Sequence, residues 1–572
     1  MGEAATLEPG RQLCTRETKP ITEPGESFGN ISSNAFQDSG VQTAEGIDTM
    51  SRAKVFAIWL SIVCGVMCTF LDEGIIATAI PQITDEFHSL SDVGIANCLG
   101  TKWYGSAYLL TLCAFQLVFG RLYSQFRIKI VYLASLATFE LGSLLCALSP
   151  SSTAFIAGRA MSGCGGAGLM SGTIALFAAA LPAKRLPFYI GAVGIVYGLA
   201  SVLGPVVGGL ITNSYLTWRW CFYINLPMAA PPAMAAIFFL RVRVPVRTDY
   251  AERPWIQKLF EFDYLGMILL LPGITCLILA LEFGGARYGW SDGRTIGCIV
   301  AAGLLLAAFA WEQWWIGERA LVPPRIIRMR IVLFASLYTY CLESTFLTLV
   351  YYIPLWFQAI QGMTAEQSGV RYLPLCVAFI VAIFSSGWIV TKVGYFQPFM
   401  LAGTILVSVG SGLLSTLKVS SGANRWIPYQ IIAGIGIGAS TEQPSIAAQS
   451  LLSEADAPIG VAVVLFCRNL GPATFISVAN SIFARTLATG IRSRLPGVDP
   501  GLITESGATA LRDQVSPEDL GALLGVYNEA LTRTFIVAAC IGAASVVGLL
   551  GIGTQRLQTE ADDTSSRNKE RS

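Results

Sequence analysis

Long apolar runs recur along most of the chain, and polar connections separate them. A helix that spans the hydrocarbon core of a bilayer needs about 20 consecutive, mainly apolar residues. The runs of this length predict an all-α membrane protein with fourteen membrane-spanning helices. These lie at residues 54–83, 100–120, 130–149, 153–180, 188–212, 219–240, 263–284, 295–316, 332–358, 369–390, 397–417, 426–449, 459–484 and 532–553.

Positively charged residues gather in alternate connections. Cytoplasmic loops of membrane proteins carry an excess of Lys and Arg. With the amino terminus in the cytoplasm, the inner loops hold fifteen such residues and the outer loops hold seven, counting those at the ends of spans. We therefore expect both termini to be cytoplasmic, as polar, disordered tails.

The composition fits an integral membrane protein and argues against several other classes. Apolar residues make up 53% of the 572 residues, and charged residues make up 13%, about half the charged share of soluble domains. This excludes a disordered chain and argues against a soluble enzyme with one or two anchors. The net charge of +1 provides no basic field for nucleic acid. The lipid bilayer is therefore an expected partner, and nucleic acid is not.

Metal and nucleotide chemistry leaves no signature in the sequence. His88 is the only histidine, and the cysteines are scattered through apolar runs without a C-x-x-C pair. No metal site is therefore predicted. The chain contains no G-x-x-x-x-G-K-[ST] loop, so ATP-driven pumping is not expected. We predict a protein that is not an enzyme.

Charged residues inside the apolar runs are the strongest functional signal. Asp72 lies 13 residues before Asp85 and Arg159 lies eight residues after Ser151, about 20 Å and 12 Å from the outer face along their helices. The two side chains can therefore meet, and we predict a proton-coupling pair, because a carboxylate beside a buried guanidinium can titrate from one side and be shielded from the other. A fixed structural ion pair is the alternative. The other ionisable residues within spans are Glu73, Glu140, Glu282, Glu343, Glu442 and Arg468.

Glycine and proline cluster in the fourth and fifth predicted spans. The fourth contains a glycine-rich run over residues 158–168, and the fifth contains a gating motif made of Gly204, Pro205, Gly208 and Gly209. Small residues let helices approach closely, and a Gly-Pro step bends a helix. A moving gate and static close packing both fit this pattern. Gly471-Pro472 echoes Gly204-Pro205 about 270 residues later, which suggests the repeated halves found in secondary transporters.

Several motifs together resemble one known family. They are Leu71-Asp72-Glu73 leading to Pro81, a loop motif with Gly120, Arg121, Arg127 and Lys129, the arginine Arg159, the segment 204–209, and the segments 218–227, 352–358 and 368–374. On these residues the chain resembles the major facilitator superfamily, specifically its fourteen-span drug:proton antiporter branch of filamentous fungi. The loop motif departs from the family pattern, with Ser124 where Asp is usual and Arg127 where Gly is usual.

The resemblance implies a domain organisation. Two six-helix bundles, at 52–241 and 317–553, would flank two inserted helices at 263–316. The remaining segments would be cytoplasmic tails at 1–51 and 554–572, a cytoplasmic loop at 242–262, and an extracellular loop at 485–531 inside the second bundle.

The resemblance also implies a function, which we state as a hypothesis. A monomer, driven by the proton gradient and without a cofactor, would export a small organic secondary metabolite, mycotoxin or drug across the plasma membrane, or alternatively the vacuolar membrane. Uptake of a nutrient or siderophore, and a non-transporting receptor or scaffold, are the alternative functions. The side chains that we expect on the substrate cavity wall are Gln116, Tyr197, Glu343, Tyr351, Tyr352, Trp356, Gln443 and Asn480.

Overall fold

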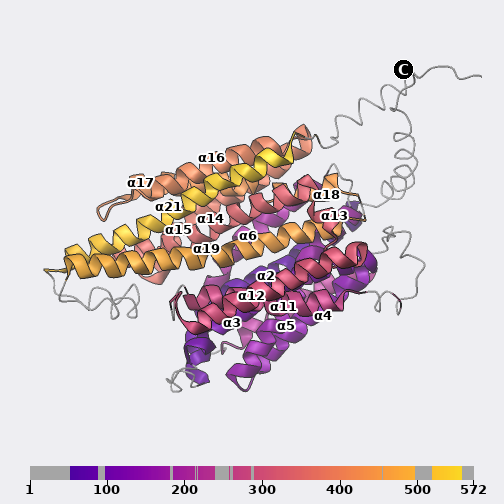
Figure 1. Ribbon diagram of the computed structural model, residues 1–572, viewed down its shortest axis with the longest axis horizontal. Coiled ribbons are helices and arrows are strands. Elements are labelled where there is room, and N and C mark those ends of the chain that lie inside the picture. The colour runs from indigo at the N-terminus through magenta and orange to yellow at the C-terminus, as the bar shows by residue number, and fades with distance from the viewer. Residues whose placement is uncertain are drawn as a thin grey trace, which may run out of the picture. The chain divides into compact units, whose positions relative to one another are not determined.

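A computed structural model describes most of the apolar part of the chain (Figure 1). The described residues are 52–87, 97–180, 185–212, 214, 217–238, 257, 262–284, 289–453, 455–495, 518–554 and 556. The predicted tail 1–51, nearly all of the predicted tail 554–572, most of the predicted loop 242–262 and residues 496–517 of the predicted outer loop lie outside them. All residues described below belong to one unit, 51–572.

Helices occupy the first six predicted spans. They are α2 (Arg52–Glu86), α3 (Asn97–Gln125), α4 (Ile128–Leu148), α5 (Ser152–Ala180), α6 (Leu186–Thr212), α7 (Trp220–Tyr223) and α8 (Asn225–Phe238). The sixth span, predicted as one helix, is therefore divided at residue 224. Pro227 lies in the first turn of α8, where a residue without a backbone N–H is tolerated.

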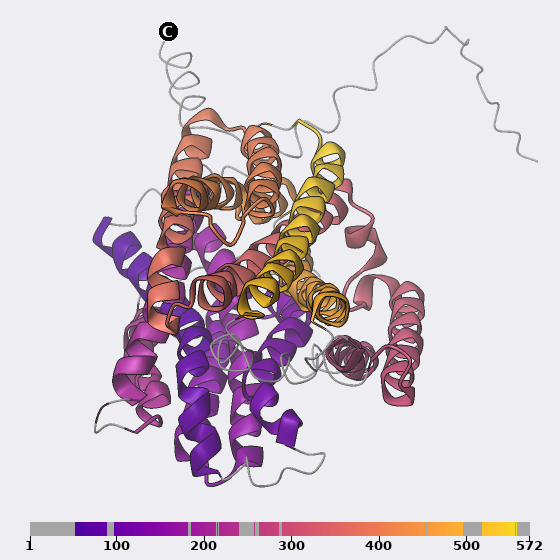
Figure 2. The same ribbon diagram turned by 90° about the vertical axis from the view of Figure 1, so that its left-hand side faces the viewer.

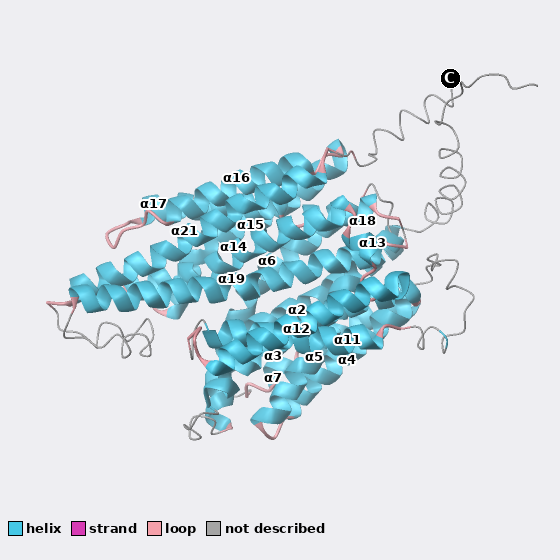
Figure 3. Cartoon of the chain, in the orientation of Figure 1, coloured by secondary structure: helices cyan, strands magenta, loops and turns pink. Residues whose placement is uncertain are grey.

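The rest of the chain is also helical, and the described residues contain no strand (Figure 3). Its helices are α11 (Tyr264–Glu282), α12 (Gly293–Ile316), η2 (Gly317–Arg319), α13 (Pro324–Ile327), α14 (Arg330–Gln361), α15 (Ala365–Val393), α16 (Gln397–Leu414), α17 (Ala423–Ser440), α18 (Gln443–Leu451), α19 (Ala457–Arg494) and α21 (Leu520–Ile552).

Two predictions need correction in this part. The predicted span 426–449 is broken between α17 and α18, and Pro444 lies in the first turn of α18, where a missing backbone N–H is tolerated. The predicted outer loop 485–531 is shorter than expected, since α19 runs on to Arg494 and α21 begins at Leu520. Eleven helices in the described part are long and apolar enough to cross a membrane, so the count of fourteen spans stays a prediction.

The helices form two sets (Figure 2), and the order of contacts between helices is the same in both sets. In the first set α2 packs on α6, and α5 packs on both α3 and α4; in the second set α14 packs on α19, and α17 packs on both α15 and α16. The sets meet along two seams, α6 against α15 and α3 against α19. The same order of contacts in both sets agrees with the internal repeat suggested by Gly204-Pro205 and Gly471-Pro472.

Glycine lets neighbouring helices touch backbone to backbone in the first set. A Cβ atom on Gly165 of α5 would lie 2.3 Å from the backbone nitrogen of Phe139 in α4, and one on Gly142 of α4 would lie 2.4 Å from that of Ser162 in α5. Real Cβ atoms do not come this close, so these glycines serve the crossing of α4 and α5. Static packing is therefore a sufficient reason for this part of the 158–168 run.

Both seams between the sets are tightly closed at one end. At the α3–α19 seam, a Cβ on Gly120 would lie 2.3 Å from the Cβ of Ala462; at the α6–α15 seam, one on Gly387 would lie 2.7 Å from the carbonyl oxygen of Pro187. These residues lie at the end of α3, near the starts of α19 and α6, and near the end of α15. In the predicted orientation this closed end is the cytoplasmic one.

Candidate functional site

Asp72 of α2 and Arg159 of α5 form an ion pair deep in the first set. Both are about 1% exposed. The Nη1 of Arg159 donates to Asp72 Oδ2, and its Nε donates to the carbonyl oxygen of Tyr104 at 2.8 Å. The expected meeting of the two residues therefore occurs, and no lipid-facing position is involved.

The second carboxylate oxygen of Asp72 has its own partner. Asn225 Nδ2 at the start of α8 donates to Asp72 Oδ1 at 3.2 Å and lies 3.2 Å from Ser143 Oγ of α4. Sequence reasoning missed Asn225, although the residue lies inside the 218–227 motif. The ion pair and its hydrogen bonds thus join five helices, α2, α3, α4, α5 and α8.

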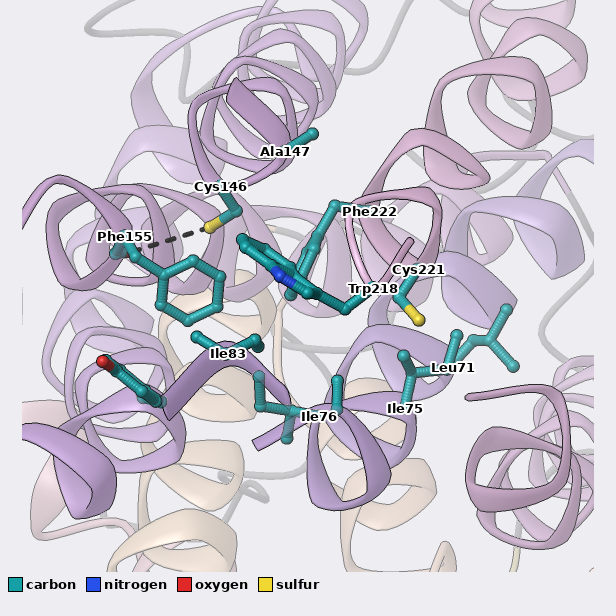
Figure 4. Packing of buried hydrophobic residues seen from close by; sticks show 12 residues of the cluster. Leu71, Ile75, Ile76, Ile83, Cys146, Ala147, Phe155, Trp218, Cys221 and Phe222 are labelled. Atoms are coloured by element: carbon teal, nitrogen blue, oxygen red, sulfur yellow. Dashed lines mark hydrogen bonds between the residues drawn. The ribbon is translucent and has the colours of Figure 1, made fainter. Parts of the chain in front are cut away.

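An aromatic cluster, drawn in Figure 4, lies beside the ion pair, because the ring centre of its Phe222 is 5.9 Å from the Arg159 guanidinium. Phe155 meets Trp218 and Phe222 edge to face, with ring centres 5.6 Å and 5.3 Å apart. Trp218 Nε1 also donates to Glu86 Oε2 at 2.6 Å, and Arg219 forms an ion pair with Glu86 at 2.7 Å. The 218–227 motif therefore builds an apolar plug, anchored at the helix end, that keeps water from this side of the pair.

A cavity of about 540 Å³ lies between the two helix sets, and α2, α3, α5, α6, α11, α14 and α19 line it. Five of the residues expected on its wall line it: Gln116, Tyr197, Glu343, Tyr351 and Asn480. The cavity also contains Glu73, the neighbour of Asp72. Consecutive helical residues point about 100° apart, so α2 presents Asp72 to Arg159 and Glu73 to the cavity.

Three of the expected wall residues are not among the described residues that line the cavity. Tyr352 lies one position round α14 from Tyr351 and packs on Phe483, with ring centres 6.0 Å apart. Trp356 Nε1 donates to Asn528 Oδ1 of α21 at 2.8 Å, and Gln443 Nε2 lies 3.3 Å from Ser386 Oγ of α15. The expectation for these three is corrected, because helix phase turns them into packing between helices.

A second charged cluster borders the cavity in the second set. Arg468 of α19 forms ion pairs with Glu442 at 2.9 Å and with Glu343 of α14 at 3.3 Å. Its guanidinium lies 5.7 Å from the ring centre of Tyr197 in α6, a cation–π contact that joins the two sets. The break between α17 and α18 places Glu442 here. The sequence showed these charges but not that they come together.

The loop motif begins inside α3, whose last turns contain Gly120, Arg121 and Ser124. Ser124 Oγ donates to the carbonyl of Arg121 in its own helix at 2.8 Å. Arg121 Nη2 donates to the carbonyl of Glu318 at 2.9 Å. Glu318 lies in the linker, residues 317–329, that precedes α14 of the second set. Of the remaining motif residues, Arg127 is exposed and Lys129 Nζ donates to the carbonyl of Ile237 at 2.6 Å.

The same linker reaches the start of α19. Arg325 of α13 forms ion pairs with Asp456 at 2.8 Å and with Glu318 at 3.1 Å. Hydrogen bonds to these two carboxylates raise the pKa of Arg325 above its usual range. The chain of contacts from Arg121 to Asp456 therefore ties α3 to α19 at the closed end of their seam.

The gating motif of α6 contacts the helix that carries Asp72. A Cβ on Gly204 would lie 2.8 Å from the Cα of Gly74 in α2, whereas one on Gly209 would meet nothing within 4 Å. Thr212 Oγ1 donates to the carbonyl of Gly208 at 2.8 Å. Pro205 lies within α6, and its side chain is outside the described part. Gly204 thus has a steric reason to be glycine, whereas Gly209 does not.

We expect Gly204→Ala to destabilise the protein by about 1–3 kcal/mol, the usual cost of overpacking, and to slow transport. Gly209→Ala is the matched control in the same motif, and we expect it to be neutral. Detergent-induced unfolding measured by Trp fluorescence tests the first effect, and efflux from vesicles tests the second. Equal behaviour of the two variants would contradict a role for the α2–α6 contact.

Among the described residues, no group of three or more His, Cys, Asp or Glu side chains could hold a metal ion.

Comparison with known protein families and with curated proteins gives a single answer. The model of the Major Facilitator Superfamily matches residues 62–476. The MFS-type efflux pump MFS1 of Trichophyton rubrum is 39% identical over 532 residues, which cover 93% of this chain and 97% of that protein. The efflux pump bfoC of Aspergillus brasiliensis is 44% identical over 492 residues, covering 86% and 85% of the two chains.

Solved structures add evidence on the fold. The proton:xylose symporter XylE superposes with a TM-score of 0.57 at 12% sequence identity, over 90% of this chain and 100% of that chain. At this identity the likeness concerns the arrangement of the helices alone.

Proposed function

The chain belongs to the major facilitator superfamily, and from this premise we propose that it is a proton-coupled efflux transporter for a small organic secondary metabolite, toxin or drug. Support for export comes from relatives named as efflux pumps that match this chain over most of its length. The observation that carries the proton coupling is the buried pair of Asp72 and Arg159 beside a cavity between two helix sets.

We propose that transport works by alternating access, with the bundles 52–241 and 317–553 rocking about the cavity. The two seams, α6 on α15 and α3 on α19, are the surfaces that separate and close. The tight approaches at Gly120 and Gly387 then belong to a state closed toward the cytoplasm. Opening that end would break the contact of Arg121 with the linker.

Protonation of Asp72 would drive the rocking through packed helices. A neutral carboxyl gives up the charge that holds Arg159, which loosens α2 from α5. Helix α2 touches α6 at Gly204, and α6 touches α15 near Gly387. A shift of α2 is therefore passed to one of the two seams. A substrate that binds more tightly to the other state of the cavity would then be exported in exchange for the proton.

The protein is a multi-pass membrane protein. We further propose that it acts as a monomer in the plasma membrane, with both termini in the cytoplasm, and that the proton gradient is its only energy source. This placement follows from the distribution of Lys and Arg and from the direction of export. A vacuolar membrane is the alternative site.

Inside-out membrane vesicles with an acidic interior test the proposal. Ethidium, a lipophilic cation, should accumulate in vesicles that contain the protein and should leave when nigericin collapses the pH difference. Vesicles without the protein are the control. Accumulation that persists after nigericin is added would overturn the proposed proton coupling. If neither ethidium nor the metabolites of the source cells are transported, the proposed export is overturned. A comparison of the culture media of deletion and wild-type strains supplies those metabolites.

A further inference from the structure

Helix α11, the first of the two inserted helices, lies along the seam between the two helix sets. It packs against α3 from the first set and against α19 from the second. Leu270 and Ile274 of α11 share one buried apolar cluster with Leu117 of α3 and Ile459 of α19. An inserted helix at the periphery would contact one set or neither, so this position gives α11 a part in the central assembly.

The start of α11 is fixed to its surroundings by hydrogen bonds. Asp263 accepts from the backbone nitrogen of Gly266 at 2.7 Å, from Gln313 Nε2 of α12 at 2.6 Å and from the backbone nitrogen of Leu321 at 2.8 Å. Leu321 belongs to the linker that Arg121 of α3 also contacts. The helix is thus anchored at the closed end of the seam, and its other half extends along the cavity.

The second half of α11 reaches the cavity itself. Ile278 and Leu281 are among the residues that line it, next to Cys113 of α3 and Ile476 of α19. On the same helix, Leu265 and Ile268 are 53% and 64% exposed. The helix therefore has one face toward the lipid and one face toward the cavity. The two described residues of α11 that line the cavity are apolar, whereas Glu73, Glu343 and Arg468 supply charge elsewhere on the wall.

We infer that α11 is a third wall of the substrate cavity and that Ile278 and Leu281 are specificity-determining residues. They would contact the apolar part of an amphipathic organic substrate and limit its bulk. The inference rests on the proposed function, because it names the substrate surface of the same cavity. Apolar pockets discriminate between substrates that differ by one methylene by about 10–200-fold, so a change of side-chain volume here is expected to alter selectivity.

The transport test compares two lipophilic cations of different shape, flat ethidium and bulky tetraphenylphosphonium. Ile278→Trp should lower the rate for tetraphenylphosphonium relative to ethidium by about tenfold or more. Leu281→Ala should move the ratio in the opposite direction. The matched controls are Ile268→Trp and Leu265→Ala, which make the same changes on the lipid face of the same helix. An unchanged ratio in both cavity variants would overturn the inference.

A labelling test separates this inference from the proposed function. Ile278→Cys and Ile268→Cys are placed in a background without the other reachable cysteines, Cys113 of the cavity included. A charged, water-soluble maleimide should label position 278 and leave position 268 unlabelled. If position 278 is labelled but the wild-type protein does not export, α11 lines the cavity and the proposed export function is wrong. If Ile278→Cys is not labelled in a protein that does export, only the inference that α11 lines the cavity is wrong.

Discussion

Asp72→Asn is expected to abolish proton-driven efflux and to lower the free energy of unfolding by about 3–5 kcal/mol. The substitution leaves the Arg159 guanidinium, which is about 1% exposed, without its carboxylate. Removal of one member of a buried pair is costly because the remaining charge has neither water nor counter-charge around it. Transport should fail because the amide of Asn does not take up and release a proton. Nigericin-sensitive uptake in vesicles and unfolding in detergent measure the two effects.

The double variant Asp72→Asn, Arg159→Gln separates these two consequences. With both charges removed, most of the lost stability should return, since two neutral amides can hydrogen-bond to each other. Transport should remain absent, because the protonatable group is still missing. Gradient-driven efflux by the double variant would show that the pair is purely structural, which is the alternative that the sequence left open.

Arg468→Gln is expected to have an effect on stability of similar size, about 3–5 kcal/mol. Arg468 forms ion pairs with both Glu442 and Glu343. Its loss leaves two carboxylates near each other at the edge of the cavity, and it also removes the cation from the ring of Tyr197. We therefore expect export to be lost along with the contact across the seam.

Glu343→Gln is the matched variant for Arg468→Gln. It leaves the Glu442–Arg468 pair, at 2.9 Å, in place, so its cost should be about 1 kcal/mol, the net value of one hydrogen bond. Unfolding in detergent and ethidium efflux measured on both variants test the difference. A Glu343→Gln variant as unstable as Arg468→Gln would contradict the view that Glu442 is the main partner.

The prediction of helices from the sequence worked where hydrophobicity alone decides the structure. The all-helical class and the major facilitator family are confirmed. The errors lie at prolines and at amphipathic ends. The predicted span 426–449 is two helices with a break beside Glu442, and α19 extends ten residues beyond the predicted end of its span at residue 484. A hydropathy window averages over such breaks and stops where charged residues begin, although a helix can continue into water.

The site was only partly accessible from the sequence. Depth along a helix follows from residue counting, which placed Asp72 and Arg159 close enough in depth for their side chains to meet. The direction of a side chain follows from helix phase and from the rotation of each helix against its neighbours. Neighbours along α14 therefore separate, with Tyr351 on the cavity wall and Tyr352 behind it. For the same reason, the third partner of the ion pair, Asn225, could not be foreseen.

The sequence by itself determined that this protein lies in a lipid bilayer and that it is helical. It also determined the family and the depth of the buried charges. Each of these depends on local composition, on spacing along one helix or on motifs. The tertiary structure decided which charges pair, which of the expected wall residues face the cavity and that helix α11 lies in a seam. These features depend on the rotation and lateral packing of helices that are far apart in the chain. Such packing is set by the fit of many small contacts, and no single stretch of sequence contains it.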